Sequence, residues 1–221
     1  MKKLYGIGIG PGDKELITMK GYRLIRECHV VFIPESNGES LAGRIAEDYI
    51  KDKKLVRLEF PMGDDNKENY IKASKVVEET LSDDEWGVFL TLGDPMVYST
   101  FLYLMAELEK RHVETESIPG ISSFTAAASR AKLPITLRGE NFYLCDGDIN
   151  EDILKTVNTI CILKTTKNKE GILDTLERNS FKYVYVKRCT QGDEKILYTR
   201  DEILKDRDYI SLIIGGREIN D

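Results

Sequence analysis

Three short stretches combine glycine or proline with small polar residues, which are the residue types that line sites where backbone groups meet a ligand. In chain order they read GIGIGPGD, LTLGDPMVYS and SIPGISS. Glycine allows a backbone to approach a ligand closely, and Asp or Ser can form hydrogen bonds there. Each stretch alone is also an ordinary turn, with Asp13, Ser122 or Ser123 capping a helix. Together, the three stretches predict loops that line one ligand site.

The first stretch is similar to a turn that binds the pyrophosphate of a dinucleotide, but it lacks the third small residue of that motif. That motif requires G-x-G-x-x-G/A before a helix whose free amides face the phosphates. Here the third position is Pro11 or Asp13, depending on the glycine from which counting starts. Proline lacks an amide donor, and a carboxylate would repel the phosphates. The stretch therefore predicts a site for another ligand.

Side chains suited to nucleophilic or metal chemistry are few and scattered. The chain has two histidines, His29 and His112, so a Ser-His-Asp triad or a His-rich metal site is hard to assemble. No CxxC pair occurs, and the cysteines are expected to be buried thiols. They are Cys28, Cys145, Cys161 and Cys189. We expect no metal site in the protein itself, and the sequence identifies no catalytic base; Tyr98, Asp13 and water remain open.

Composition narrows the class of protein further. Of the 221 residues, 41% are hydrophobic and 32% are charged, as in globular proteins. The formal net charge of -6 disfavours a general nucleic-acid binder, which needs a basic surface. No stretch approaches the roughly 20 apolar residues of a membrane span, and the N-terminus lacks the apolar core of a signal peptide. A cytoplasmic protein without membrane or nucleic-acid partners is expected.

The elements that must position the three stretches alternate in the first half of the chain. Short β-rich runs alternate with amphipathic segments, which predicts an α/β domain with a parallel sheet covered on both faces. Strands are expected at 3–9, 30–33, 54–60, 86–92 and 113–118. Helices are expected after Asp13, from Ser40 through Tyr49, and over Lys67–Leu81.

The second half has a higher density of strands. Pro119-Gly120 is the clearest break, and we place the boundary there, giving an N-terminal α/β domain of residues 1–117 and a C-terminal α/β domain of residues 118–221. A helix over 122–130 precedes the runs FYLC, TICILK, YVYVK, EKILYT and YISLIIGG. Short turns between most of these runs predict a mixed sheet with antiparallel pairing.

The order and separation of GIGIGPGD, TLGDPMVYSTF and IPGISSFTAAAS resemble those of the tetrapyrrole (corrin/porphyrin) methylases, which use S-adenosylmethionine. The resemblance extends from Tyr5 to about Gly215. The segments FPMGDD, GDPMVYSTFLYL and SLII are most similar to members that methylate C20 of precorrin-2 or its cobalt complex, cobalt-factor II, in cobalamin biosynthesis. The activity that this resemblance implies is a C20-methyltransferase.

The resemblance also implies an assembly and a set of ligand contacts. It implies a homodimer of two-domain subunits, with S-adenosylmethionine in a cleft between the domains and the tetrapyrrole in an adjoining trough. Lys164 stands where many relatives have methionine or a small residue. The cofactor-binding residues implied by position are Pro11, Leu92, Gly93, Asp94, Val97, Ser122, Ser123, Leu163, Lys164, Leu212 and Ile213.

A tetrapyrrole of this kind carries several carboxylates, so an acidic protein must attract it locally. Arginine fits carboxylate geometry well, although most arginines are solvated surface charges. The candidates are Arg44, Arg57, Arg130, Lys132 and Arg138.

Two other functions remain open from the sequence. Within the same fold, the protein could methylate a different carbon of a precorrin, or it could methylate uroporphyrinogen III. From a different class, the protein could be a dinucleotide-dependent oxidoreductase, although the broken glycine motif weighs against it.

Overall fold

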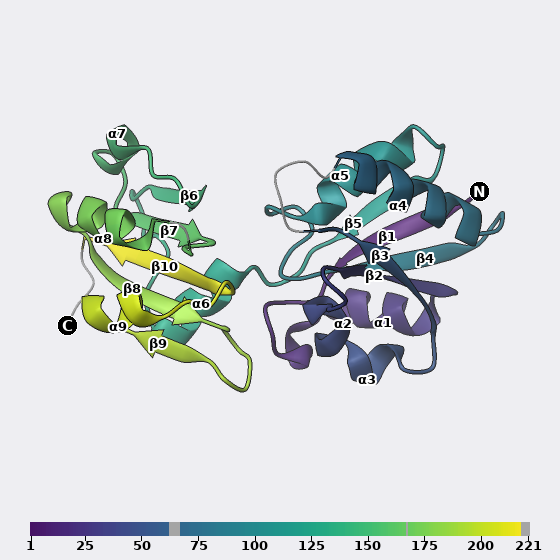
Figure 1. Ribbon diagram of the computed structural model, residues 1–221, viewed down its shortest axis with the longest axis horizontal. Coiled ribbons are helices and arrows are strands. Elements are labelled where there is room, and N and C mark those ends of the chain that lie inside the picture. Colours follow the sequence, from purple (N-terminus) through teal and green to yellow (C-terminus); the bar gives the residue numbers. More distant parts are fainter. Residues whose placement is uncertain (62–66, 167, 218–221) are drawn as a thin grey trace. The chain divides into compact units, whose positions relative to one another are not determined.

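The chain forms two compact units in the computed structural model. Unit 1 is Met1–Ser122 and unit 2 is Ser123–Asp221, and Figure 1 labels their helices and strands. The structure describes residues 1–61, 67–166 and 168–217.

Two sequence predictions depend on where these limits fall. The predicted boundary between residues 117 and 118 lies inside the last strand of unit 1. Of the stretch FPMGDD, only Phe60 and Pro61 lie within the described residues.

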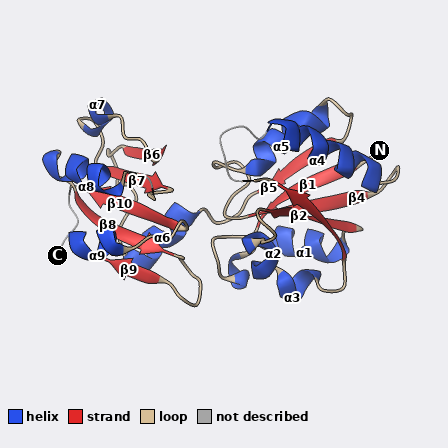
Figure 2. Ribbon diagram, in the orientation of Figure 1, coloured by secondary structure: helices blue, strands red, loops and turns tan. Residues whose placement is uncertain are grey.

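Unit 1 contains a five-stranded sheet in the order β3-β2-β4-β1-β5. Every neighbouring pair of strands is parallel, so the predicted parallel sheet is confirmed. Figure 2 shows the strands side by side with helices on both faces. The strands are β1 (Lys3–Gly8), β2 (Val30–Glu35), β3 (Lys54–Glu59), β4 (Trp86–Thr91) and β5 (Glu114–Ile118).

The helices of unit 1 cover the two faces of this sheet separately. Helices α1, α2 and α3 share one hydrophobic cluster with Ile7 and Leu90, whereas α4 and α5 share another with Leu4 and Phe89. Alternate residues of a strand point to opposite faces, which explains why neighbours in β1 and β4 belong to different clusters. The helices are η1 (Lys14–Leu16), α1 (Met19–Glu27), α2 (Leu41–Ile45), α3 (Glu47–Ile50), α4 (Lys67–Thr80) and α5 (Thr100–Glu109).

One helix prediction for unit 1 is wrong, because the structure has two short helices in place of one continuous helix. The sequence predicts a single helix from Ser40 through Tyr49, but the structure breaks it at Ala46, whose φ of -89° and ψ of 3° are not helical. The fully buried Ala46 lies in the same cluster as Ile45 and Ile50. Packing of both short helices against the sheet outweighs the local four-residue periodicity, which cannot by itself reveal such a break.

Unit 2 contains a second five-stranded sheet in the order β6-β7-β10-β8-β9. Strand β6 is parallel to β7, whereas β10 is antiparallel to both β7 and β8, so the predicted mixed sheet is confirmed. The strands are β6 (Phe142–Asp146), β7 (Thr159–Leu163), β8 (Lys182–Lys187), β9 (Lys195–Leu197) and β10 (Ser211–Gly216).

The helices of unit 2 also divide between two faces. Helices α7, α8 and α9 supply Leu154, Leu173 and Ile203 to the cluster that includes Ile162 and Ile213 of the sheet. Helix α6 contacts β8 and β10 through a face of buried alanines. The helices are α6 (Ser123–Ala131), α7 (Glu151–Leu154), α8 (Lys169–Arg178) and α9 (Arg200–Lys205).

Candidate functional site

Three glycines bring the backbones of neighbouring strand ends into direct contact in unit 1. Gly8 ends β1, Gly93 follows β4, and Gly120 follows β5. A Cβ atom on Gly120 would lie 2.1 Å from the carbonyl oxygen of Gly93 and 2.6 Å from Cα of Gly8. A Cβ on Gly8 would lie 2.6 Å from Cα of Gly120. Since these distances are far below van der Waals contact, only glycine fits at these two positions.

The loops after β1 and β4 are also joined by hydrogen bonds. Gly93 N donates to Gly10 O at 2.8 Å, and Gly10 N donates to Gly93 O at 3.3 Å. The φ angles of 78° at Gly10 and 71° at Gly93 lie in the left-handed region that favours glycine. The first glycine stretch thus serves close approach between loops at the carboxyl ends of the strands, where parallel α/β sheets bind their ligands.

Asp94 connects the loop after β4 to the loop after β5. Its Oδ2 accepts a hydrogen bond from Gly120 N at 2.9 Å, and its Oδ1 accepts one from Met96 N at 2.8 Å. Both carboxylate oxygens therefore bond to backbone amides within unit 1. The side chain of Asp94 holds the two loops in register, which is a positioning role.

The start of the segment after the first stretch does not form a phosphate-binding helix. Asp13 caps the three-residue 3-10 helix η1, and its Oδ1 accepts a hydrogen bond from Glu15 N at 2.9 Å. Pro11 is buried. A carboxylate therefore occupies the helix N-terminus that a dinucleotide pyrophosphate would need, in agreement with the interpretation of the sequence.

In unit 2, the segment after β7 has a constrained backbone at a predicted site residue. Lys164 has a φ of 53°, a left-handed conformation that costs a side-chain-bearing residue about 1 kcal/mol or more. Its Nζ forms an ion pair with Asp146 Oδ2 at 2.7 Å, and Asp146 lies opposite Leu163 in the pairing of β6 with β7. The ion pair links the ends of two adjacent strands.

The next residue is fixed by a second side-chain contact. Thr165 is fully buried, and its Oγ1 lies 3.1 Å from Ser211 Oγ. Ser211 Oγ donates to Asp208 O at 2.9 Å, so Thr165 is the donor to Ser211. The two contacts on either side of Leu163–Thr165 hold this segment against the start of β10.

A largely buried carboxylate, that of Asp206, organises the turn that leads into β10. Asp206 Oδ1 accepts hydrogen bonds from Tyr185 Oη and Asp208 N, both at 2.8 Å, and Oδ2 pairs with Lys187 Nζ at 2.5 Å. Burial opposes ionisation of Asp206, but Lys187, the Asp208 amide and Tyr185 outweigh it, so its pKa falls to about 2. Lys169 Nζ donates to Asp206 O at 2.9 Å, which adds a buried cation to this network.

The predicted cofactor-binding residues fall into one group in each unit. In unit 1, the structure brings the loop after β4 together with the loops after β1 and β5; this group comprises Pro11, Leu92, Gly93, Asp94, Val97 and Ser122. In unit 2, Leu163 lies opposite Leu212 in the antiparallel pairing of β7 with β10. The fully buried side chain of Ile213 packs in the core of the unit. The second group comprises Ser123, Leu163, Lys164, Leu212 and Ile213.

The set predicted from sequence leaves out residues that shape these groups. Gly8 and Gly120 lie within the glycine stretches, and their position at strand ends was a sufficient signal. Asp146 is the last residue of β6, and Thr165 lies two residues after the end of β7, where a polar residue near a parallel strand end is a recognisable sign of a site. Ser211 begins the run SLII, which contributes to the family resemblance, and it was not among the predicted site residues.

The surroundings of the four cysteines and of His29 indicate structural roles. All four cysteines are buried and free, as predicted. Burial raises the pKa of Cys28 and Cys145 to about 11 and that of Cys189 to about 12, so these thiols are not reactive nucleophiles. His29 Nδ1 lies 3.2 Å from Trp86 O.

Two absences apply to the described part of the chain. No group of three or more His, Cys, Asp or Glu side chains there is arranged to hold a metal ion. None of the described helices combines the length and the apolar character needed to cross a membrane.

The basic residues that were candidates for carboxylate binding are divided between the two units. Arg44 and Arg57 line one hollow of unit 1, and unit 2 contains Arg130, Lys132 and Arg138. Arg57 Nη1 pairs with Glu35 at 3.0 Å, and Arg130 Nη2 pairs with Glu194 at 2.7 Å. Arg44 lines a hollow of unit 1 and is exposed. Arg57 and Arg130 are therefore each committed to a carboxylate of their own unit, which weakens their candidacy as main anion-binding residues.

Comparison with known proteins identifies the class to which this fold and these loops belong. The chain matches the tetrapyrrole (corrin/porphyrin) methylases over residues 3–203, and it belongs to that family, as the sequence motifs predicted. The protein named "Probable cobalt-precorrin-2 C(20)-methyltransferase" of Methanocaldococcus jannaschii is 35% identical over 223 residues, which cover 98% of this chain and 97% of that protein.

A second relative and a solved structure extend this comparison. The cobalt-precorrin-2 C(20)-methyltransferase of Salmonella typhimurium is 33% identical over 145 residues, covering 63% of this chain and 61% of that protein. A crystal structure of uroporphyrin-III C-methyl transferase from Thermus thermophilus, complexed with S-adenyl homocysteine, has a TM-score of 0.74. It is 24% identical and covers 97% of each chain, so it shows the shared fold. The predicted fold of two α/β domains is confirmed.

Proposed function

We propose that this protein is an S-adenosylmethionine-dependent methyltransferase that adds a methyl group to C20 of precorrin-2 or cobalt-factor II in cobalamin biosynthesis. The observation that carries the proposal is the 35% identity over 98% of the chain to a protein named for that reaction. The glycine contacts of unit 1 support it, because they place three loops of the family's motifs in direct contact. The names of the relatives agree with the function predicted from the sequence.

The residues of unit 1 fit a cofactor bound by backbone groups. The contact among Gly8, Gly93 and Gly120 leaves no room for a side chain at Gly8 or Gly120. Leu92 is 38% exposed beside this contact and offers an apolar surface. S-adenosylmethionine, when bound, supplies a methyl group on a sulfonium, whose departure needs no acid catalyst. A site that lacks an arranged metal cluster or triad within its described residues is therefore compatible with the reaction.

The role of the protein in this chemistry is to position two ligands. Reactants held at near-attack distance gain much of their acceleration from lost translational freedom. Asp94 fixes the loops after β4 and β5 by its bonds to Gly120 N and Met96 N. Asp146 and Thr165 fix Leu163–Thr165 in unit 2. We assign to these three side chains the positioning of the cofactor-binding backbone.

We further infer which residues contact the cofactor. The exposed Leu92 and half-buried Val97 are proposed contacts from unit 1, and the Leu163–Lys164 backbone is the proposed contact from unit 2. The N-terminal domain is proposed to hold the tetrapyrrole, while the C-terminal domain completes the binding of S-adenosylmethionine. No side chain is assigned as the base.

A homodimer in the cytoplasm is the proposed working form. Three large apolar side chains within residues 96–103 are between 49% and 60% exposed, which is typical of a surface that another molecule covers. They are Met96, Tyr98 and Tyr103. Four free, buried thiols agree with a reducing compartment.

The proposal is tested by locating the transferred methyl group. The purified protein is incubated with S-adenosylmethionine carrying a ¹³C-methyl group and with precorrin-2, cobalt-factor II or uroporphyrinogen III in turn. NMR of the product should place the label at C20 of one of the first two. Label at a ring carbon, or methylation of uroporphyrinogen III alone, would contradict the assignment within the family.

Ligand binding separates the proposal from the oxidoreductase alternative. S-adenosylhomocysteine at 100 times its dissociation constant should stabilise the folded state by about 2.7 kcal/mol, which is a rise of several degrees in the melting temperature. NAD should leave the melting temperature unchanged, because Asp13 occupies the helix end that a pyrophosphate would need. Stabilisation by NAD instead would favour the oxidoreductase.

A further inference from the structure

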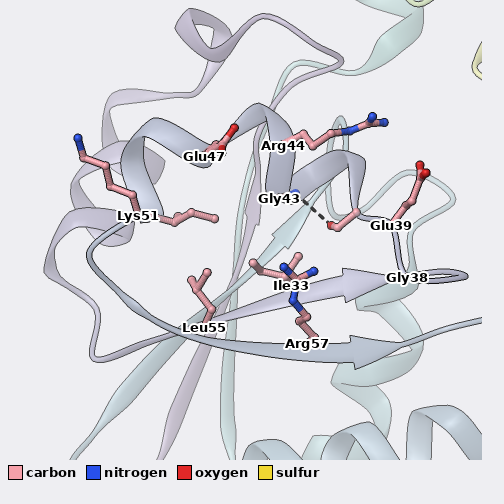
Figure 3. Close-up of a pocket in the computed structure, with 11 residues that line it drawn as sticks. Ile33, Gly38, Glu39, Gly43, Arg44, Glu47, Lys51, Leu55 and Arg57 are labelled. Carbon is pink, nitrogen blue, oxygen red and sulfur yellow. Dashed lines mark hydrogen bonds between the residues drawn. The ribbon is translucent and has the colours of Figure 1, made fainter.

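A hollow of about 470 Å³ lies in unit 1 between two short helices and the edge of the sheet. Figure 3 shows helices α2 and α3 along one side and strands β2 and β3 along the other. Its apolar part is formed by the buried Ile33 and Ile50 and by Leu55, which is 39% exposed. The hollow therefore offers an apolar floor that is open to solvent.

Charged side chains surround this floor. Arg44 comes from α2, Arg57 from β3, and Lys51 from the turn after α3. Figure 3 shows Arg57 extending from β3 toward α2, with Arg44 and Glu39 at one end of the hollow and Lys51 at the other. Arg57 pairs with Glu35, whose side chain is only 16% exposed. Within the described residues, the exposed guanidinium of Arg44 has no ion pair or hydrogen bond.

The local fold keeps Arg44 at the rim. Ser40 caps α2 by accepting a hydrogen bond from Gly43 N at 3.0 Å, drawn as a dashed line in Figure 3. The turn before the cap is closed by backbone bonds between Ser36 and Glu39 at 2.9 and 3.1 Å. These bonds fix the backbone of α2, and Arg44 lies in its last turn.

The hollow shares a sheet with the glycine loops. Strand β2 is the neighbour of β4, and β4 is the neighbour of β1. Adjacent strands are about 4.8 Å apart, so β2 and β3 lie roughly 10 to 15 Å from β1. Ile33 and Arg57 face each other near the carboxyl ends of β2 and β3, at the same end of the sheet as Gly8 and Gly93. A ligand several ångströms wide beside the glycine loops could reach the hollow with a side arm.

We propose that this hollow binds a carboxylate arm of the tetrapyrrole substrate, with Arg44 as the main anion-binding residue and Ile33, Ile50 and Leu55 contacting the methylene groups of the arm. The inference rests on the proposed function. An acetate or propionate arm has a short apolar stem and a carboxylate head, which matches an apolar floor with arginine at its rim. Arg57, held by Glu35, forms the fixed wall opposite Arg44.

Two carboxylates also line the hollow, and their effect gives the proposal a second, opposite prediction. Glu39 and Glu47 would repel the arm. Removal of the charge of Glu47 should therefore strengthen binding, whereas removal of the charge of Arg44 should weaken it. If these exposed side chains had a purely structural role, the two substitutions would not change binding in opposite directions.

The experiment compares Arg44→Gln and Glu47→Gln with Arg23→Gln. Arg23 is exposed on α1 and does not line the hollow, so it controls for loss of one positive charge in unit 1. Arg44→Gln should raise KM for the tetrapyrrole about 5- to 20-fold at low salt, with kcat and KM for S-adenosylmethionine little changed. Glu47→Gln should lower KM for the tetrapyrrole a few-fold, and Arg23→Gln should resemble the wild type.

Failure of the inference is distinguishable from failure of the proposed function. If the wild type methylates precorrin-2 or cobalt-factor II but Arg44→Gln behaves like Arg23→Gln, the carboxylate site is wrong and the function stands. Binding of uroporphyrin, measured by its fluorescence, provides a readout without catalysis. If uroporphyrin binding depends on Arg44 while no tetrapyrrole is methylated, the site stands and the proposed function is wrong. Loss of both signals in the wild type overturns both.

Discussion

The loops of unit 1 and the Leu163–Thr165 segment of unit 2 hold their shapes by different means. In unit 1, Gly8, Gly93 and Gly120 touch backbone to backbone, at distances that exclude any side chain. In unit 2, a left-handed lysine is fixed from both sides by side-chain contacts. The arrangement in unit 1 requires glycines, which carry no side-chain atoms. The arrangement in unit 2 requires polar side chains, and a mutation or a change in pH can weaken their contacts gradually. The two regions should therefore respond differently to small changes.

The largest effect is expected from Gly120→Ala. The added Cβ would lie 2.1 Å from Gly93 O, so the loops after β4 and β5 must separate. We expect a loss of roughly 1 to 3 kcal/mol of stability, or more, and at least a tenfold loss of affinity for S-adenosylhomocysteine. Thermal melts and calorimetric titration measure the two effects. Gly192→Ala is the control, because a Cβ there meets open space, and a mild Gly120→Ala variant would show that the loops yield easily.

The next effect is the acid sensitivity of unit 2 through Asp206. Its pKa is lowered in the folded state from 3.8 to about 2, so its contribution is complete above the unfolded pKa and disappears as pH falls through about 4 to 2. This contribution is about 2 kcal/mol at most, by the linkage of 1.36 kcal/mol per pKa unit. Asp206→Asn should be less stable at neutral pH and should flatten that part of the pH profile.

Two readouts assign the acid effect to one unit. The single tryptophan, Trp86, reports on unit 1, and amide exchange of β10 reports on unit 2. Asp206→Asn should accelerate exchange in β10 and leave the Trp86 fluorescence unchanged. An equal response in both readouts would remove the contrast between the two regions.

Asp94→Asn tests the side-chain link between the loops after β4 and β5. The asparagine side chain has one acceptor oxygen where aspartate has two. It can therefore accept a hydrogen bond from Gly120 N or from Met96 N, and its NH₂ group then faces the other amide donor. The expected cost is about 1 to 2 kcal/mol of stability, with weaker binding of S-adenosylhomocysteine. Unchanged binding would show that the glycine contacts alone hold the loops.

The smallest effect is expected from Thr165→Val in unit 2. Valine keeps the shape of threonine but removes the donor to Ser211, which retains its bond to Asp208 O. We expect a loss of about 1 kcal/mol and a few-fold weaker binding of S-adenosylhomocysteine. Thr165→Ser should restore both, because it restores the hydroxyl. If valine and serine behave alike, the hydroxyl does not position this segment.

Much of the fold was predictable because it depends on local pattern. The strands Lys3–Gly8, Val30–Glu35 and Trp86–Thr91 each contain a short, largely apolar run, as is typical of buried parallel strands. Helix α8 was not predicted, although Ile172, Leu173 and Leu176 have helical spacing and all pack in the core. The sequence therefore contains a signal for α8, whereas it contains no signal for the break at Ala46.

The candidate site was predictable in its motifs and only partly in its geometry. The sequence by itself determined the strands, the glycine-bearing stretches and, through them, the family. Only the tertiary structure decided that Gly120 touches Gly8 and Gly93, that Asp94 bonds to Gly120 N, and that Arg57 is paired with Glu35. The physical reason is that periodicity and turn chemistry act between near neighbours in the chain. Contacts between residues far apart in sequence depend instead on the order in which the strands pair, which no local pattern records.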